Sequence, residues 1–349
     1  MSKTLKIRKP DDWHLHLRDG TIMKSVLRET TKDFRRAIIM PNLSPPIIRS
    51  KDVLSYRNRI LNALPQEVAF DPLMTIYLTD NSDYKDIIKA HNSGLISAVK
   101  LYPAGATTNS EAGVTSIEKI FPLLEKITEA SVPICIHGEA SQMSIDIFDR
   151  EAFFIEKTLI PLRKSIPGIK IILEHITTKL GVDYVKGENE NLAATITTHH
   201  LIINRNYIFA GGIRPHFYCL PIAKRETDRL ALREAATSGN EKFFLGTDSA
   251  PHTDSLKENH CGCAGIFSAT NTMSYLAHVF EEEDALNNLE RFTSINGAKF
   301  YNMPINEEFC ILKKLDEPVT FPDKIKAGRE FITLFNPGFP SYWSSKGTC

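Results

Sequence analysis

Near the N-terminus the chain reads Asp11-Asp12-Trp13-His14-Leu15-His16-Leu17-Arg18-Asp19-Gly20. Side chains alternate faces along a β-strand, so we expect His14, His16 and Arg18 on one face, with Trp13 and the two leucines packing on the other. Two imidazoles at i and i+2 can hold one metal ion, and a guanidinium two residues further on can hold an anion beside it. A strand whose histidines are only hydrogen-bonded is the alternative. The rest of the chain must distinguish the two interpretations.

Short apolar runs alternate with longer amphipathic stretches along the chain, which is typical of a parallel sheet with crossover helices. Eight strands are predicted, at Trp13–Leu17, Ala37–Met40, Asp71–Tyr77, Ser97–Leu101, Pro133–Ile136, Lys170–Leu173, Ala193–Thr197 and Phe243–Gly246. Helices are predicted between them, at Lys51–Leu64, Tyr84–Asn92, Ile117–Ala130, Met143–Leu159 and Arg225–Ser238. Eight strand–helix units predict an α/β fold, a closed (β/α)8 barrel of the TIM type.

No low-complexity linker, fixed-period repeat or charge block divides the 349 residues, so we expect a single domain over residues 1–349. Residues 285–349 form its predicted C-terminal extension. Helix is expected at Ala285–Met303, and irregular Pro/Gly-rich chain from Asp316 to Cys349, with a short strand as an option at Phe331–Phe335. No separate β-sandwich domain is expected.

The composition points to a small ligand. Apolar residues make up 42% of the chain, enough for a substantial core, and 42 basic residues balance 42 acidic ones. This balance leaves no net charge to recruit nucleic acid or an anionic membrane, so a small neutral or anionic molecule fits better. No hydrophobic signal core follows the N-terminus, and no run of about 18 or more apolar residues occurs. A cytosolic location is therefore expected.

Six cysteines, at 135, 219, 261, 263, 310 and 349, are sparse and show no disulfide-framework spacing, so free thiols are expected. The cluster His260-Cys261-Gly262-Cys263 could be half of a zinc knuckle, but no matching Cys or His pair lies nearby.

Polar residues follow the predicted strands where the strands end. His137 follows the fifth, Glu174-His175 the sixth, and Asp248 the eighth. In a (β/α)8 barrel these ends meet on the face where sites are built. Any one of these side chains alone would more often be a hydrogen-bonded loop residue, but buried imidazoles and carboxylates are costly unless paired or coordinated. Their joint placement predicts a metal site.

Lys100 lies at the end of the fourth apolar strand. A lysine there could reach out of the barrel or pair with a carboxylate. Burial would lower its pKa and give a neutral, nucleophilic amine. Such an amine can take up carbon dioxide as a carbamate, whose two oxygens could bridge two metal ions.

These motifs together resemble the binuclear amidohydrolase superfamily and, within it, the short bacterial dihydroorotases. The resemblance covers most of the chain, with no departure at a ligand position. Its blocks are Trp13–Asp19, Met40–Asn42, Lys100–Pro103, Ile136–Glu139, Leu173–His175, Arg214–His216, Gly246–His252 and Cys261–Gly265.

The resemblance implies two zinc ions per subunit and a bridging hydroxide as nucleophile. One ion would be held by His14, His16 and Asp248, and the other by His137 and His175. Lys100, carboxylated to N6-carboxylysine, would bridge both. Asp248 would act as general base and then general acid.

The resemblance also implies reversible hydrolysis of the cyclic amide of (S)-dihydroorotate to N-carbamoyl-L-aspartate, the third step of de novo pyrimidine biosynthesis. The substrate carboxylate would be bound by Arg18, Asn42 and His252. Backbone groups of Leu220 and Ala264 would meet the amide edges of the ring, which replaces the zinc-knuckle interpretation of the Cys-Gly-Cys run. The family further implies a homodimer.

The small-residue run at 103–110 follows the lysine strand. Composition alone favours an ordinary flexible connection. The resemblance implies a lid instead, with Thr107 and Thr108 closing on the substrate.

His199 and His200 offer a tempting further metal site, but the ligand set is complete without them, and ordinary hydrogen bonding is expected for both. His91, His216, His260 and His278 receive no catalytic role. A related cyclic amidase, such as a dihydropyrimidinase or hydantoinase, is the nearest alternative. Those relatives generally carry an N-terminal β-sandwich segment, and a substrate without a carboxylate would not need the Arg18 and Asn42 clamp. A non-enzymatic barrel is a second alternative, opposed by the presence of all six ligands.

Overall fold

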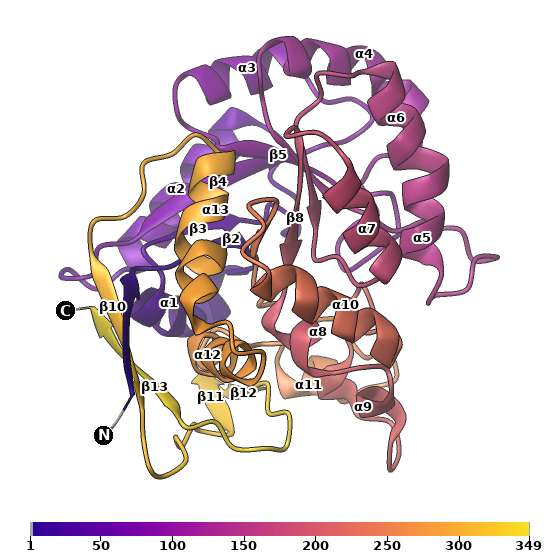
Figure 1. Cartoon of the computed structure of the whole chain (residues 1–349). Coiled ribbons are helices and arrows are strands. Elements are labelled where there is room, and N and C mark those ends of the chain that lie inside the picture. The colour runs from indigo at the N-terminus through magenta and orange to yellow at the C-terminus, as the bar shows by residue number, and fades with distance from the viewer. Residues whose placement is uncertain (1–2, 349) are drawn as a thin grey trace.

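A ring of eight parallel strands forms the centre of the molecule, whose computed structural model describes residues 3–348 (Figure 1). The strands lie in chain order, each hydrogen-bonded to the next. Leu15 forms a parallel bridge with Ser249, and the His16 N–H donates to the Ser249 carbonyl at 3.2 Å. These contacts join the first strand to the chain that follows the last strand, and so close the ring. The predicted (β/α)8 barrel is confirmed. Its strands are β2 (Asp11–Leu15), β3 (Arg36–Ile39), β4 (Asp71–Tyr77), β5 (Ala98–Leu101), β6 (Ile134–His137), β7 (Ile171–Glu174), β8 (Leu192–Ile196) and β9 (Phe243–Leu245).

Apolar residues on both faces of the strands explain why the ring forms. One set, including Ile134 and Ile136, joins the large core between the strands and the surrounding helices. The alternate set, including Cys135 and Ile172, forms a smaller apolar cluster inside the ring. Strands buried on both faces read as continuous apolar runs, as the sequence does here.

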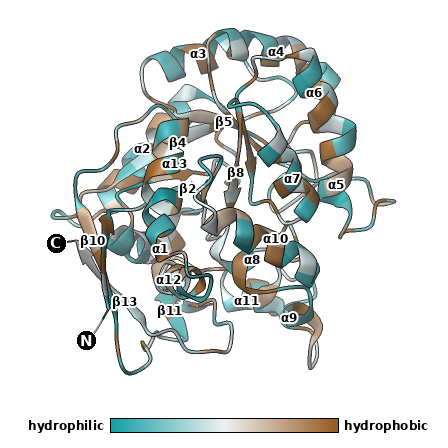
Figure 2. Cartoon of the chain, viewed as in Figure 1, coloured by the Kyte–Doolittle hydropathy of each residue, from teal (hydrophilic) through white to brown (hydrophobic). Residues whose placement is uncertain are grey.

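Helices cover the outside of the ring, and each mixes hydrophilic and hydrophobic residues along its length (Figure 2). Four predicted helices are confirmed: α2 (Ser50–Ala63), α3 (Tyr84–Asn92), α4 (Ile117–Glu129) and α10 (Glu226–Thr237). The others include α1 (Gly20–Asp33), α7 (Lys179–Gly187), α8 (Thr198–Ile202), α9 (Asn206–Phe209), α11 (Asp254–Lys257) and α12 (Thr272–Glu282). No helix of the described residues is long and apolar enough to cross a membrane.

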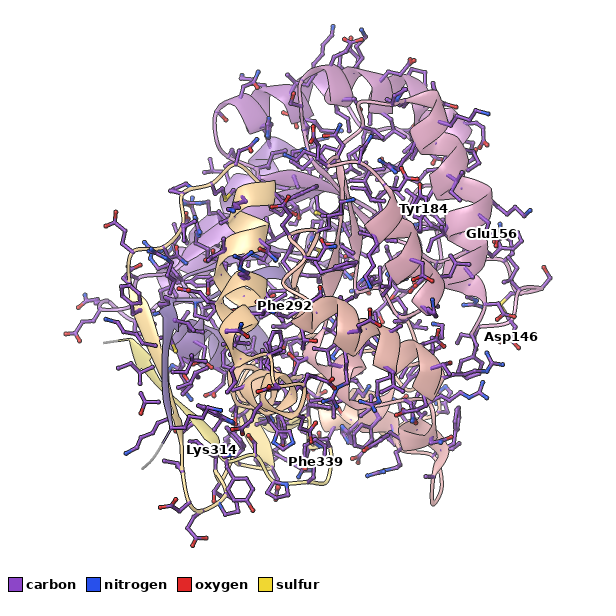
Figure 3. The ribbon with its side chains drawn as sticks, viewed as in Figure 1. Asp146, Glu156, Tyr184, Phe292, Lys314 and Phe339 are labelled. Carbon is purple, nitrogen blue, oxygen red and sulfur yellow. The ribbon has the colours of Figure 1, made fainter. Side chains whose placement is uncertain are left out.

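The helix predicted over Met143–Leu159 is wrong at its start. It begins at Arg150 as α5 (Arg150–Phe154) and continues through a π turn (Ile155–Leu159) into α6 (Ile160–Ser165). Met143 is 90% exposed, and Asp146 lies at the periphery of the molecule, beyond the helix (Figure 3). Residues 143–149 form turns instead, in which Ile147 and Phe148 still pack against the large core. The Phe148 N–H donates to Asp146 Oδ1 at 2.8 Å, a local hydrogen bond that competes with helix formation.

Trp13 lies inside the barrel, so its predicted place beside Leu15 and Leu17 is wrong. The pairing of β2 with β3 shifts between Asp12 and Leu15, which breaks the simple alternation of faces. The Trp13 ring stacks on Tyr301, with centroids 4.8 Å apart. Tyr301 follows α13 (Asn296–Phe300), which packs against the end of the barrel opposite the predicted ligands. At Gly297 an added Cβ would lie 2.1 Å from Trp13 Nε1, so only glycine permits this close packing.

The C-terminal extension is more regular than predicted. An antiparallel sheet joins β1 (Thr4–Arg8), β10 (Phe309–Lys314) and β13 (Trp343–Thr348), so the first and last strands of the chain lie on either side of β10 (Figure 1). A hairpin joins β11 (Lys324–Ala327) to β12 (Glu330–Thr333). The expectation of irregular chain after Asp316 is therefore wrong, although β12 overlaps the optional strand at 331–335. Cys349 lies outside the described residues. The expectation that residues 1–349 form a single domain stays a prediction.

Candidate metal centre and active site

The predicted ligands converge at the carboxyl ends of the barrel strands. Each comes from the last residues of a strand or from the residues directly after it, and all six are buried. They are His14 and His16 from β2, Lys100 from β5, His137 from β6, His175 after β7 and Asp248 after β9.

Three of these side chains form a compact triangle of donor atoms. His14 Nε2 lies 3.2 Å from His16 Nε2 and 3.2 Å from Asp248 Oδ1, and His16 Nε2 lies 3.1 Å from the same oxygen. Tetrahedral zinc with bonds of about 2.0 Å has ligand-to-ligand edges of about 3.3 Å. The triangle therefore fits one zinc ion without rearrangement of these three residues.

Glu174 is a site residue to which the sequence assigned no role. Its Oε1 lies 3.0 Å from His14 Nδ1, and its Oε2 contacts the Lys100 ammonium. A carboxylate on the second nitrogen of a metal-binding histidine fixes the orientation of the ring. The available signal was its position as the last residue of a buried apolar strand, directly before His175.

The remaining ligands gather beside this triangle. The His137 and His175 rings have centroids 4.8 Å apart, and the His14 and His175 rings 4.9 Å apart. His137 Nε2 lies 2.9 Å from Glu139 Oε2. This leaves Nδ1 of His137 available to a metal ion, and Glu139 is a second partner that the sequence did not identify.

Burial sets the protonation of these groups. It lowers the pKa of His14 and His175, and it lowers that of His16 to about 3, so the imidazoles are neutral, the form that binds metal ions. Burial also lowers the pKa of Lys100 to about 7, although contact with Glu174 favours the ammonium. Burial alone opposes a charged Asp248, yet the facing imidazoles hold its pKa well below the ordinary value.

Backbone strain is concentrated at this centre. Arg18, His175 and Asp248 have positive φ angles of 58°, 43° and 45°. Residues other than glycine rarely adopt this region, and they do so mainly where a function requires the resulting side-chain direction. The turn after β7 is fixed by a hydrogen bond from the His175 N–H to Thr195 Oγ1, at 2.7 Å.

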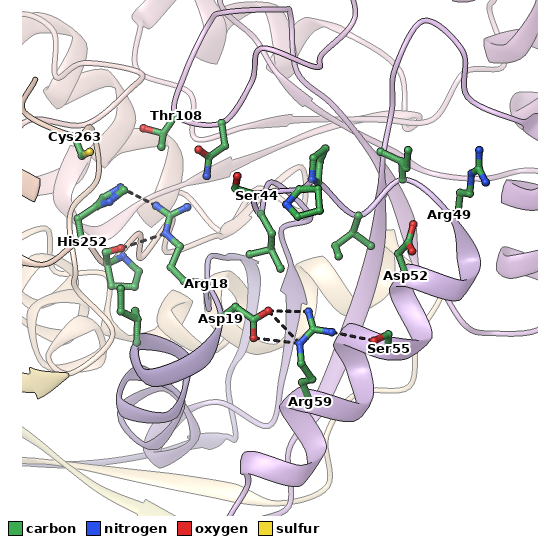
Figure 4. A pocket seen from close by; sticks show the side chains of 18 of the residues that line it. Arg18, Asp19, Ser44, Arg49, Asp52, Ser55, Arg59, Thr108, His252 and Cys263 are labelled. Carbon is green, nitrogen blue, oxygen red and sulfur yellow. Dashed lines mark hydrogen bonds and ion pairs between the residues drawn. The ribbon is translucent and has the colours of Figure 1, made fainter. Parts of the chain in front are cut away.

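Arg18 lies beside the metal ligands, between a small cavity and a larger outer cleft. Its Nε donates to the Pro251 carbonyl at 3.2 Å, and its Nη2 lies 3.0 Å from His252 Nε2 (Figure 4). Its Nη1 is buried without a hydrogen-bond partner among the described residues. The outer cleft has a volume of about 750 Å³ and includes Arg18, His252 and Thr108.

Most predicted site residues line the small cavity. It brings together His16, Arg18, Asn42, Thr107, Thr108, His137, His175, Leu220, Asp248 and Ala264. His252 is separate from this lining but contacts it, because its Nε2 lies 3.1 Å from the Ala264 carbonyl.

The loop after β5 reaches over this cavity. Asn42 Nδ2 donates to the Thr108 carbonyl at 3.1 Å, and Asn109 Nδ2 donates back to the Asn42 carbonyl at 3.1 Å. Thr108 Oγ1 lies 3.4 Å from the Ala264 carbonyl. The loop is thus attached to two of the predicted substrate-binding residues.

The expectation of ordinary hydrogen bonding for His199 and His200 holds for one of the two. His200 Nδ1 lies 2.8 Å from Thr197 Oγ1, and its Nε2 lies 3.0 Å from the Pro221 carbonyl. His199 is fully buried, and neither ring nitrogen has a partner among the described residues, so the expectation is wrong for it. Its ring packs edge-on against Phe335 instead. Cys261 and Cys263 are free thiols, as are the other described cysteines.

Comparison with known proteins agrees with this geometry. The model of the amidohydrolase family matches residues 11–306. The dihydroorotase of Chelativorans sp. (strain BNC1) is 59% identical over 341 residues, which is 98% of this chain and 99% of that protein. This chain belongs to the dihydroorotases of the amidohydrolase family. The dihydroorotase of Ruegeria sp. (strain TM1040) is 58% identical and covers 99% of both chains.

Solved dihydroorotases share the whole fold. The Campylobacter jejuni structure superposes with a TM-score of 0.89 at 38% identity and covers 99% of this chain and 98% of that one. The L-hydantoinase of Arthrobacter aurescens superposes with a TM-score of 0.81 at 17% identity, covering 99% of this chain and 84% of that one, which shows a shared fold alone. The family predicted from the sequence motifs is confirmed.

Proposed function

We propose that this dihydroorotase-family chain catalyses the reversible hydrolysis of the cyclic amide of (S)-dihydroorotate to N-carbamoyl-L-aspartate, the third step of de novo pyrimidine biosynthesis. The observation that carries the proposal is the triangle of His14, His16 and Asp248, with edges of 3.1–3.2 Å, beside the lone guanidinium of Arg18. The first feature suits a metal-dependent hydrolase, and the second suits a substrate with a carboxylate.

Two zinc ions are the proposed cofactors. His14, His16 and Asp248 would hold one, His137 and His175 the other, and carboxylated Lys100 would join them. When bound, such ions generate a nucleophile from water at neutral pH and polarise the carbonyl under attack. Neutral buried imidazoles and a lysine whose pKa burial lowers to about 7 support this assignment.

Asp248 is the proposed proton carrier. Its pKa lies well below the ordinary value, so it is a carboxylate able to accept a proton at neutral pH. It would accept the proton released by the attacking water and deliver it to the leaving amide nitrogen. A hydrogen bond from the Asp248 N–H to the His14 carbonyl, at 2.9 Å, fixes its backbone for this task.

The substrate carboxylate would be bound by Arg18, Asn42 and His252. Pro251 and His252 hold Arg18 in place and leave Nη1 for a ligand. Burial and the nearby Arg18 charge lower the pKa of His252 to about 2, so it binds as a neutral ring.

The amide edges of the ring would meet Leu220 and Ala264. Among the described residues, neither backbone group of Leu220 has a hydrogen-bond partner, nor has the Ala264 N–H. Thr107 and Thr108 would close over the bound ring as a lid. We further propose a homodimer in the cytosol that acts on a small molecule and binds neither nucleic acid nor membrane.

A substrate panel tests the proposed function. The zinc-loaded enzyme is assayed for ring opening of dihydroorotate, dihydrouracil and hydantoin, and Arg18→Gln is assayed in parallel. We expect turnover of dihydroorotate alone, and an Arg18→Gln variant whose KM for it rises about a hundredfold, since a charge-assisted contact with the substrate carboxylate is lost. Equal turnover of dihydrouracil would instead favour the dihydropyrimidinase alternative, and no ring opening by the loaded enzyme would refute the proposal.

A further inference from the structure

Lys257, at the end of α11, is a buried lysine outside the metal centre. Only 3% of the residue is exposed. Its Nζ donates to three backbone carbonyls, those of Tyr218 at 2.9 Å, Cys263 at 2.8 Å and Gly265 at 2.8 Å. An ammonium group has three N–H donors, so all of them are used.

The three carbonyls belong to two segments that carry a wall of the small cavity. One segment contains Tyr218 and Leu220, and the other runs from Cys263 to Gly265 and contains Ala264. Leu220, Ala264 and Gly265 all line the cavity. The Gly265 N–H also donates to the Tyr218 carbonyl at 3.0 Å, so the two segments are joined directly as well as through the lysine.

The second segment has little freedom to adjust. Gly265 has a φ of +153°, and an added Cβ there would lie 2.5 Å from the Ala250 carbonyl oxygen. The backbone therefore packs against Ala250 on one side and is held by Lys257 through its carbonyls. A small displacement of this segment would move Ala264 within the cavity.

The charge of Lys257 is balanced in an unusual way. The titratable and charged groups around it are the Cys219 and Cys263 thiols, the Tyr218 ring, the His252 imidazole and the Arg18 guanidinium, with no carboxylate among them. A buried ammonium is costly unless its donors are fully satisfied. Backbone carbonyls accept from all three of its donors, so the position of these carbonyls and the charge of the lysine depend on each other.

We propose that Lys257 is a positioning residue for substrate binding, which holds the backbone of Leu220 and Ala264 at the separation that the two polar edges of the substrate ring require. The inference rests on the proposed function, because it takes the cyclic amide as the ligand of these backbone groups. Lys257 itself contacts neither the substrate nor the metal ions.

The test compares Lys257→Met with a matched control, Lys242→Met. The half-buried Lys242 also donates to three backbone carbonyls, those of Val185, Lys186 and Glu188, but at the end of α7 and away from the cavity. We expect Lys257→Met to raise the KM for dihydroorotate about tenfold, with kcat changed less than about threefold and zinc content unchanged. We expect Lys242→Met to leave both constants unchanged, whatever its effect on unfolding.

An unchanged KM in a folded, zinc-loaded Lys257→Met enzyme would overturn the inference, as would an equal rise in Lys242→Met. If the wild-type enzyme opens no dihydroorotate ring, the proposed function itself fails. The two failures are therefore distinguishable.

The pH dependence of KM in the wild-type enzyme is a second test, which does not depend on whether Lys257→Met folds. Burial lowers the pKa of Lys257 to about 8, and the Tyr218 ring is a further titratable group beside it. Between about pH 7 and about pH 9.5 the ammonium loses a proton and one of its three donors. We expect the wild-type KM to rise severalfold over this range, and that of Lys257→Arg, which keeps its charge and leaves the thiols in place, to stay flat. A flat wild-type KM, or an equal rise in both proteins, would contradict the inference.

Discussion

Glu139, to which the sequence assigned no role, contacts a proposed metal ligand. Its carboxylate oxygen Oε2 lies 2.9 Å from His137 Nε2, and both side chains are buried. Partners of this kind orient a ligand ring and raise its basicity. We expect Glu139→Gln to weaken binding of the second zinc ion by about 10–100-fold, measured by competition with a chelator of known affinity.

Glu258→Gln is the matched control for this experiment. Glu258 Oε1 lies 2.8 Å from His216 Nε2, a similar pair near the surface. Zinc affinity in this variant should equal that of the wild type. Equal affinity in Glu139→Gln would show that the pair does not support the metal ion.

The reactivity of Lys100 should depend on pH in a defined direction. Only the neutral amine takes up carbon dioxide, and burial lowers the pKa of Lys100 to about 7. Below pH 7 the ammonium predominates and is unreactive, whereas above pH 7 the amine predominates. At equal concentrations of dissolved ¹³CO₂, which requires more total bicarbonate at pH 8, we expect carbamate formation in the metal-free protein to be about tenfold faster at pH 8 than at pH 6, measured by NMR.

Lys170→Ala provides the reference for the carbamate signal. Lys170, directly before β7, is only half-buried, and its ammonium packs over the Phe300 ring. Its loss should leave the signal intact, whereas Lys100→Ala should remove it. A signal that persists without Lys100 would assign the carbamate to another amine.

Among single residues, the sequence located the six proposed ligands that the structure brings together, but it did not locate their partners. His137, His175 and Asp248 each follow an apolar strand, so their position on the barrel rim follows from the pattern. Glu174 and Lys257 act through contacts with residues that lie far away in the sequence or on separate loops. No local pattern encodes such contacts.

Among the elements, the loop after β5 contacts two of the proposed substrate-binding residues. Thr108 is tied to Asn42 through its carbonyl and lies 3.4 Å from the Ala264 carbonyl through Oγ1. We expect Thr108→Ala to lower kcat about tenfold or more, since lid contacts form fully only as the reaction proceeds.

The control for the lid is Thr115→Ala. Thr115 Oγ1 donates to Asp80 at 2.6 Å beyond the other end of the loop, away from the cavity. Steady-state turnover should remain near that of the wild type in this variant. Unchanged turnover in Thr108→Ala would show that this loop does not act as a lid in catalysis.

The α13 element closes the barrel end opposite the metal centre, a role that periodicity could not reveal. The strand containing Trp13 departs from a simple alternation of side chains between its two faces. Tyr301, on which the Trp13 ring stacks, lies nearly 300 residues away in the chain. We expect Trp13→Ala to lower the free energy of unfolding by about 3–5 kcal/mol, measured by denaturant titration.

Phe331→Ala, at a residue 49% exposed on β12, should change the free energy of unfolding by no more than about 0.5 kcal/mol. A Trp13→Ala protein as stable as this control would show that the stacked pair contributes little to the closed barrel.

At the scale of the whole molecule, eight apolar runs with helices between them were enough to predict the barrel, because strands buried on both faces leave a clear pattern. The flanking antiparallel sheet was not predictable in the same way. It pairs Thr4–Arg8 with Phe309–Lys314, and its third strand, Trp343–Thr348, is mostly polar. Pairing between segments so far apart in the chain leaves no local pattern, and a mostly polar segment lacks the apolar residues by which a strand is recognised.

A zinc titration of the metal-free enzyme shows whether the centre is binuclear. Hydrolysis of dihydroorotate is followed after each addition of zinc in the presence of bicarbonate. Activity should rise to a plateau at two zinc ions per chain. Lys100→Ala should stay inactive until a short carboxylate such as acetate replaces the missing bridge. Full wild-type activity in the presence of a strong chelator, or a plateau at one ion per chain, would contradict the account.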